Sequence, residues 1–123
     1  MNKNSLLLII WMSSLFGDLI HPPDGSELSY VHIMFQWEES ILSDGYNFEL
    51  STTNDFSSPL VDITTIEPYY IEKNNIGWQS IYFWRVRPFM YDTPGEWMIG
   101  MFSAGENSVT FQNDDNPIEI LEY

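Results

Sequence analysis

The chain has 123 residues, no cysteine and a formal net charge of −14 at pH 7. This length leaves room for one domain with a hydrophobic core. Hydrophobic residues make up 44%, which argues against disorder over most of the chain. Without cysteine, disulfides, thiolate nucleophiles, iron–sulfur clusters and cysteine-based zinc sites are excluded. The acidic balance disfavours nucleic acid and anionic lipid as partners. Solubility in a salty or extracellular setting explains this acidity more simply than cation binding does.

Residues 1–17 have the pattern of a secretory signal peptide. Lys3 gives a short positive start, residues 6–12 (LLLIIWM) give a compact apolar run, and Ser13 and Gly17 are small residues near a cleavage point. The run is shorter than the roughly 20 residues that a transmembrane helix needs. A buried N-terminal strand or helix is the alternative. The pattern predicts a secreted, periplasmic or cell-surface protein that has no membrane contact after signal removal.

From there to residue 103 the chain consists of short strands separated by turns. Residues 21–25 form an extended Pro-Pro start that ends in an Asp-Gly turn. Apolar and polar residues alternate over residues 31–37 and 46–51, and a β-branched run covers residues 60–66. The remaining predicted strands cover residues 69–72, 81–87 and 96–103. Seven strands without helical spacing predict an all-β fold, a seven-stranded antiparallel immunoglobulin-like sandwich.

The strand at residues 81–87 has two different faces, because successive side chains point to opposite sides of a sheet. Its core face holds three large apolar side chains: Tyr82, Trp84 and Val86. Its other face carries two of the four cations of the chain, and its members are Phe83, Arg85 and Arg87. We therefore expect the first set to be structural and the second set to project from the sheet.

Residues 21 to 103 resemble a fibronectin type III domain of the bacterial exported type. The resemblance rests on four segments: Trp37 at the end of an alternating strand, YNFELSTTNDFSSPLV from Tyr46, YFWRVRP from Tyr82, and the Gly-Glu-Trp at residues 95–97. It implies a fibronectin type III β-sandwich in which Tyr82, six residues after Ile76, forms a tyrosine corner. The hydroxyl of this tyrosine would bond to the backbone upstream. The resemblance also implies structural roles for Trp37, Tyr46, Trp84 and Val86.

The sequence offers no catalytic or metal-binding motif. His21 and His32 lie in different elements, and no Gly-x-Ser-x-Gly elbow or calcium-binding loop is present. The acidic run at residues 113–116 (NDDN) is explained more simply as a solvated linker than as a calcium site. We predict no enzyme activity within this chain and no cofactor.

Phe83, Arg85 and Arg87 are the candidate ligand-binding residues. An aromatic ring beside two guanidiniums can stack on a sugar or clamp a sulfate or carboxylate. The alternative, which the many acids favour, is that both arginines pair with Glu49 on the neighbouring strand. No Arg-Gly-Asp tripeptide is present, so integrin-type binding is not carried over from the family.

Three segments are predicted: a signal peptide at residues 1–17, a fibronectin type III-like domain at 18–103, and an acidic linker or start of a following domain at 104–123. The first functional hypothesis is a non-catalytic exported module, monomeric, that acts as a spacer or contacts an extracellular protein or glycan. The second is an N-terminal accessory domain that contacts other domains of a larger secreted enzyme. For this context, the tail is similar to the linker of propeller-type arylsulfotransferases. None of the catalytic residues of that enzyme can be placed on this chain.

Overall fold

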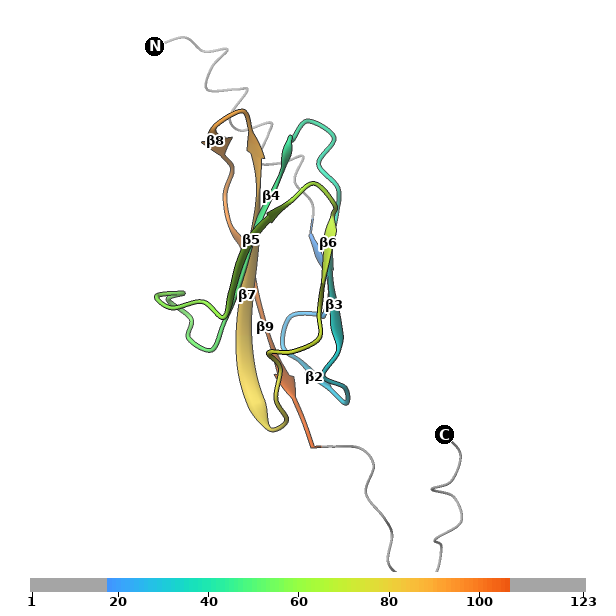
Figure 1. Ribbon diagram of the computed structural model, residues 1–123. Helices are drawn as coiled ribbons and strands as arrows, with labels where there is room; N and C mark the ends of the chain where they lie inside the picture. The colour runs from blue at the N-terminus through green and yellow to red at the C-terminus, as the bar shows by residue number, and fades with distance from the viewer. Residues whose placement is uncertain (1–17, 107–123) are drawn as a thin grey trace, which may run out of the picture.

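The computed structural model describes residues 18–106, which form two packed β-sheets (Figure 1). The smaller sheet has the strand order β1-β3-β6, with bounds Leu19–His21, Ile33–Trp37 and Tyr69–Glu72. The larger sheet has the order β2-β9-β7-β4-β5, with β8 paired to β7. Its bounds are Ser26–Leu28, Met98–Ala104, Ser80–Met90, Gly45–Ser51, Val61–Thr65 and, for β8, Thr93–Pro94. The predicted all-β sandwich is confirmed.

Some sequence predictions lie outside the described residues. These are the signal peptide at residues 1–17 and the part of the acidic linker from residue 107 onward. Within residues 18–106, no helix is long and apolar enough to span a membrane. The last described strand ends at Ala104, and the backbone N–H of Gly105 still donates to the carbonyl of Leu28 at 2.8 Å.

Residues 18–106 form nine strands, where the sequence predicted seven. One addition arises because the N-terminal strand is split: β1 pairs antiparallel with β3, and β2 pairs parallel with β9 in the other sheet. Pro22 and Pro23 lie between β1 and β2 and have no backbone N–H to donate, so the ladder breaks there. The other addition is the two-residue β8, which folds back onto the end of β7. The β2–β9 pair is thus a parallel exception in a sandwich predicted to be antiparallel.

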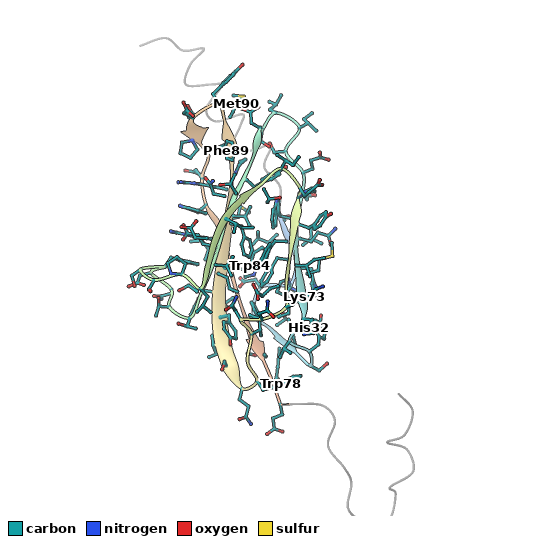
Figure 2. All side chains as sticks on the ribbon, in the orientation of Figure 1. His32, Lys73, Trp78, Trp84, Phe89 and Met90 are labelled. Atoms are coloured by element: carbon teal, nitrogen blue, oxygen red, sulfur yellow. The ribbon has the colours of Figure 1, made fainter. Side chains whose placement is uncertain are left out.

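The core lies between the sheets and is rich in aromatic rings. Trp84 is fully buried at its centre, and its ring contacts those of Phe35, Phe48 and Trp37 at centroid distances of 5.0, 6.1 and 6.5 Å. Figure 2 shows Trp84 midway along the sandwich. Such edge-on and tilted packing fills the interior densely. Replacement of Trp84 by alanine would cost about 3–5 kcal/mol in similar cores.

Two tyrosine hydroxyls tie loops to this core. The backbone N–H of Gly77 donates to the Tyr82 hydroxyl at 2.7 Å, which is the bond expected of a tyrosine corner. The backbone N–H of Ser40 donates to the Tyr46 hydroxyl at 2.8 Å. Both rings are buried with the core, so each bond fixes a loop against the end of a sheet.

Glu72, at the end of β6, is a buried carboxylate that organises the following turn. Its Oε2 accepts hydrogen bonds from the backbone N–H groups of Asn74 and Asn75 at 2.7 and 2.8 Å, and its Oε1 accepts one from the Tyr70 hydroxyl. Burial alone would raise the pKa of Glu72. The hydrogen bonds to the charged form outweigh that effect and hold its pKa below the usual value.

Candidate functional site

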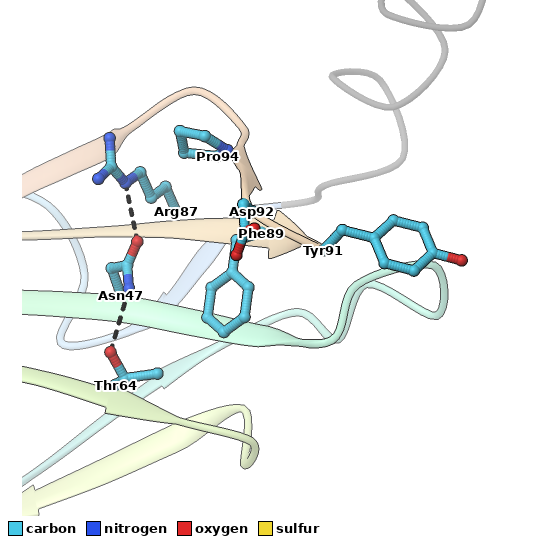
Figure 3. Close-up of a pocket in the computed structure, with 7 residues that line it drawn as sticks. All are labelled: Asn47, Thr64, Arg87, Phe89, Tyr91, Asp92 and Pro94. Carbon is cyan, nitrogen blue, oxygen red and sulfur yellow. Dashed lines mark hydrogen bonds between the residues drawn. The ribbon is translucent and has the colours of Figure 1, made fainter.

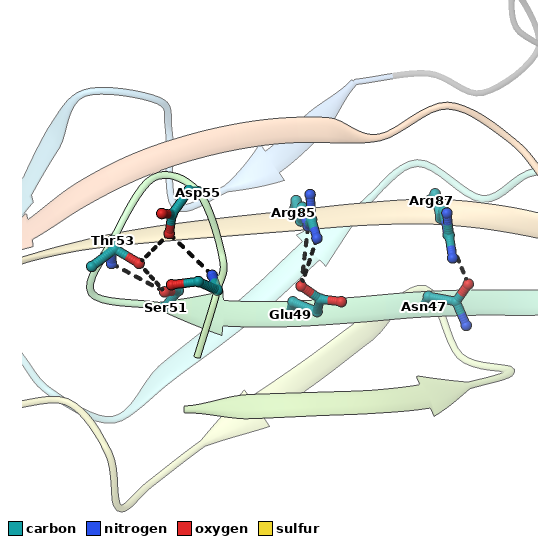
Figure 4. A network of polar contacts seen from close by, with 8 residues as sticks. Asn47, Glu49, Ser51, Thr53, Asp55, Arg85 and Arg87 are labelled. Atoms are coloured by element: carbon teal, nitrogen blue, oxygen red, sulfur yellow. Dashed lines mark hydrogen bonds and ion pairs between the residues drawn. The ribbon is translucent and has the colours of Figure 1, made fainter. Parts of the chain in front are cut away.

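The two arginines of β7 lie half-buried on the outer face of the larger sheet (Figure 4). The strand register places Glu49 opposite Arg85 and Asn47 opposite Arg87. The Nη2 and Nε atoms of Arg85 donate to Glu49 Oε1 at 2.9 and 3.1 Å. Arg87 Nε instead donates to Asn47 Oδ1 at 2.9 Å. The expected pairing with Glu49 is therefore observed for Arg85 but is wrong for Arg87. The arginines are two positions apart along β7, so they face two different residues of β4, and only one of these is Glu49.

Aromatic rings stack on both guanidiniums. The Arg85 guanidinium carbon lies 4.0 Å from the Trp97 ring centroid and 4.3 Å from that of Phe56. The Arg87 guanidinium carbon lies 4.3 Å from the Trp97 ring centroid. Alternate residues of a strand are about 7 Å apart, so one indole that contacts both guanidiniums fits between them. We call the four residues Phe56, Arg85, Trp97 and Arg87 the arginine–aromatic ladder.

Phe56 reaches this ladder from the loop between β4 and β5. Asp55 Oδ1 accepts hydrogen bonds from the Thr53 hydroxyl at 2.9 Å and from the backbone N–H of Ser57 at 3.0 Å. The Ser57 and Thr53 bonds lower the pKa of Asp55 below its usual value. Phe56, between these groups, has a φ of 53° and a buried ring. The turn thus holds the ring over Arg85.

Phe83 shares this face with the two arginines, as the alternation predicted. It lies opposite Met101 of β9 and Ser51 of β4, two residue pairs along the strand from Arg85. The ladder joins the arginines through Trp97, which the sequence had marked only as the start of a strand. A Gly-x-Trp shortly after an Arg-x-Arg strand is the signal that could have placed it there.

An open pocket of about 240 Å³ lies beside Arg87, at the end of the ladder (Figure 3). Its lining combines polar and apolar side chains: Asn47, Thr64, Arg87, Phe89, Tyr91, Asp92 and Pro94. Asn47 joins two of these residues, because its Oδ1 accepts from Arg87 Nε and its Nδ2 donates to Thr64 Oγ1 at 3.2 Å. Among residues 18–106, the two terminal nitrogens of Arg87 make no hydrogen bond. The pocket therefore holds a fixed guanidinium with free donors.

The two histidines remain apart from this site. His21 Nε2 lies 3.1 Å from the Tyr30 hydroxyl, and the two rings stack. His32 is exposed just before β3. Over the described part of the chain, no three histidine or acidic side chains gather closely enough to hold a metal ion.

Comparison with known proteins identifies the fold. No family model matches the sequence, and no curated protein matches it. The structure is similar to a solved fibronectin type III domain from the human KIAA0970 protein, with a TM-score of 0.59 at 10% sequence identity. The match covers 92% of this chain and 90% of that domain. The chain therefore has a fibronectin type III-like β-sandwich fold.

Proposed function

We propose that this chain is an exported, non-catalytic module that contacts an anionic group of an extracellular glycan or protein through the pocket beside Arg87. The fold supports a module without catalysis, since such sandwiches present faces and loops to partners. Export is supported by the signal-like pattern of residues 1–17. A spacer or accessory position next to other domains of a larger secreted protein would be compatible with the same contact.

The observation that carries the proposal is that, within residues 18–106, Arg87 is fixed in place without an acidic partner. The charge of Arg85 is matched by Glu49 at 2.9 Å. Arg87 is held by one hydrogen bond to Asn47 and by the Trp97 ring, which are both neutral groups. A guanidinium that is fixed before binding loses little side-chain entropy when a ligand arrives. In a chain of net charge −14, such an uncompensated cation is a specific point of attraction for an anion.

The lining of the pocket suggests the class of ligand. Arg87 can donate to a carboxylate or sulfate in a forked geometry. Asp92 can accept from hydroxyls, and the faces of Phe89 and Pro94 offer apolar contact. The volume is smaller than the roughly 300–1,000 Å³ of pockets for drug-sized ligands, which suits one sugar ring or one acidic side chain. A uronic or sulfated sugar combines all the required groups.

A binding assay with defined probes tests the proposal. The probes are immobilised uronate-containing and sulfated oligosaccharides, their neutral counterparts, and a peptide of alternating Glu and Ser. We expect the acidic oligosaccharides to bind, and Arg87→Ala to weaken binding by about tenfold or more, as for loss of a charge-assisted fork. Lys73→Ala is the matched control, because it removes one positive charge from an exposed site outside the pocket.

The outcomes separate the sources of the anion. Binding of the acidic peptide alone would assign the site to a protein ligand. Equal binding by the wild type, Arg87→Ala and Lys73→Ala would show that Arg87 does not form a site and would sink the proposal, as would the absence of any binding.

A further inference from the structure

Three loops come together at the end of the sandwich where β8 lies (Figure 1). They are residues 38–44 between β3 and β4, residues 66–68 between β5 and β6, and residues 91–92 between β7 and β8. We call them together the loop end. Figure 2 shows Phe89 and Met90 at this end and Trp78 at the opposite one.

Hydrogen bonds hold the three loops in place. The backbone N–H of Asp44 donates to the carbonyl of Phe89 at 2.8 Å, and Asp44 Oδ2 accepts from the backbone N–H of Tyr91 at 2.5 Å. The carbonyl of Pro68 accepts from the backbone N–H of Trp37 at 3.1 Å. Each loop is therefore fixed to a strand end or to its neighbour, and the loop end presents a defined surface.

The most exposed large hydrophobic side chains of the described residues lie on these three loops, one on each. Ile41 and Tyr91 are each 82% exposed and Ile66 is 77% exposed, whereas the next, Ile99 on β9, is 56% exposed. A single exposed apolar residue is ordinary on a protein surface. Three such residues on loops at the same end of the domain indicate a surface that a binding partner covers.

Exposed carboxylates share the three loops with these side chains. Five acidic residues lie in the same three loops, and all are exposed: Glu38, Glu39, Asp44, Glu67 and Asp92. The three loops contain no lysine or arginine. The first residue of β6 adjoins the loop end, whereas Lys73 follows the last residue of β6, at the other end of that strand. Figure 2 accordingly shows Lys73 away from Phe89 and Met90. The loop end thus combines exposed apolar side chains with five negative charges and no lysine or arginine in its loops.

We infer that the loop end is a docking site for a protein surface that presents an apolar side chain flanked by lysine or arginine. Complementary charge would steer such a partner, and the isoleucine and tyrosine side chains would supply the buried centre of the contact. A second copy of this chain fits poorly, because it would bring two acidic surfaces face to face. Anionic lipid is repelled for the same reason.

This inference goes beyond the proposed function of the pocket. The pocket would bind an anionic group, whereas the loop end would bind a positively charged partner. The two sites share Tyr91 and Asp92, which line the pocket and lie in the loop between β7 and β8. Ile41 and Ile66 do not line the pocket, and Arg87 lies outside the three loops. Variants at Ile41 and Ile66 therefore test the loop end, whereas Arg87→Ala tests the pocket.

The test uses three synthetic twelve-residue peptides and the full chain. The first peptide has leucine and tryptophan flanked by lysines, the second replaces the lysines by glutamates, and the third replaces the apolar residues by serines. Amide shifts in two-dimensional NMR locate the binding. We expect only the first peptide to shift the three loops, with an affinity that falls as salt rises.

Matched variants separate the two halves of the surface. Ile41→Ser/Ile66→Ser should weaken binding by about tenfold, and Glu38→Gln/Glu39→Gln/Glu67→Gln should weaken it and reduce its salt dependence. Ile99→Ser removes an exposed isoleucine of the β9 strand and should have no effect.

Four results would overturn the inference. The first is that no amide of the three loops shifts, and the second is that the Ile41→Ser/Ile66→Ser variant binds the first peptide as tightly as the wild type. The third is that the wild type binds phosphatidylcholine vesicles and this variant does not. The fourth is that the wild type self-associates and this variant does not. Because all substituted side chains are exposed, an unchanged thermal unfolding midpoint is expected and shows that the variants fold.

Discussion

Arg85 of β7 and Glu49 of β4 face each other across the larger sheet, with Arg85 Nη2 and Glu49 Oε1 2.9 Å apart. Both side chains are mostly shielded from solvent, at 22% and 14% exposure. The rings of Phe56 and Trp97 contact the same guanidinium at about 4 Å. The pair therefore belongs to a packed unit on the outer face and does more than neutralise surface charge.

The first prediction concerns this pair. Glu49→Gln keeps the size of the side chain but removes its charge, and leaves Arg85 uncompensated beneath two rings. We expect the free energy of unfolding to fall by about 1–2 kcal/mol, above the usual value for an exposed pair. Urea denaturation measures the change. Asp62→Asn is the control, because Asp62 pairs with Glu49 in the β-ladder but is exposed on β5. Equal losses in both variants would contradict the role of the pair.

The second prediction concerns the tyrosine corner. Tyr82→Phe removes the acceptor of the Gly77 backbone N–H, whose bond measures 2.7 Å, and keeps the buried ring. We expect a loss of about 1 kcal/mol in the free energy of unfolding, the usual value for such a bond. Tyr69→Phe removes an exposed hydroxyl and should cost little. If thermal unfolding shifts equally in the two variants, the corner bond contributes nothing.

Alternation along single strands made much of this fold predictable. Tyr82, Trp84 and Val86 are buried and Arg85 and Arg87 lie outward, because a strand assigns neighbours to opposite faces whatever pairs with it. The core-facing residues of β3 follow in the same way, although β3 begins at Ile33 and not at residue 31.

The site depends on how strands and loops are placed against one another, and the alternation of residues along a single strand does not predict that placement. Arg87 bonds Asn47 and not Glu49 because of the register of β7 against β4, which a shift by one pair would change. Trp97 and Phe56 reach the arginines from a neighbouring segment and from a loop with a positive φ. The Gly-x-Trp after the Arg-x-Arg strand is a local signal for Trp97, but no local pattern fixes the position of Phe56.

The third prediction is a loss of stability in acid that depends on Glu72. The pKa of Glu72 lies below its usual value of 4.5 in the folded protein, because hydrogen bonds to the charged form outweigh burial. Its contribution to stability is therefore complete above pH 4.5 and disappears as the pH falls through the lower folded pKa.

Glu72→Gln should therefore be less stable than the wild type at neutral pH. The difference between the two should shrink as the pH falls below 4.5. Urea denaturation across this range is the measurement, and Glu67→Gln, at an exposed loop position, is the control. A difference between wild type and Glu72→Gln that stays constant down to the lowest pH would refute the linkage.

The fourth prediction concerns the phenol of Tyr70, whose pKa is raised to about 12. Burial is the larger cause, and the hydrogen bond and negative charge of Glu72 add to it. Because the folded pKa exceeds the usual value of 10.0, this tyrosine favours the folded state fully below pH 10.0. That contribution is lost as the pH rises toward about 12.

Phenolate absorbance during alkaline titration measures this directly. We expect Tyr70→Phe to remove a component that titrates near pH 12, whereas Tyr91→Phe, which removes a phenol that is 82% exposed, leaves that component in place. Glu72→Gln removes the charge but not the burial, so it should bring the pKa of Tyr70 only part of the way back toward 10.0. A complete return to 10.0 would make Glu72, and not burial, the dominant cause.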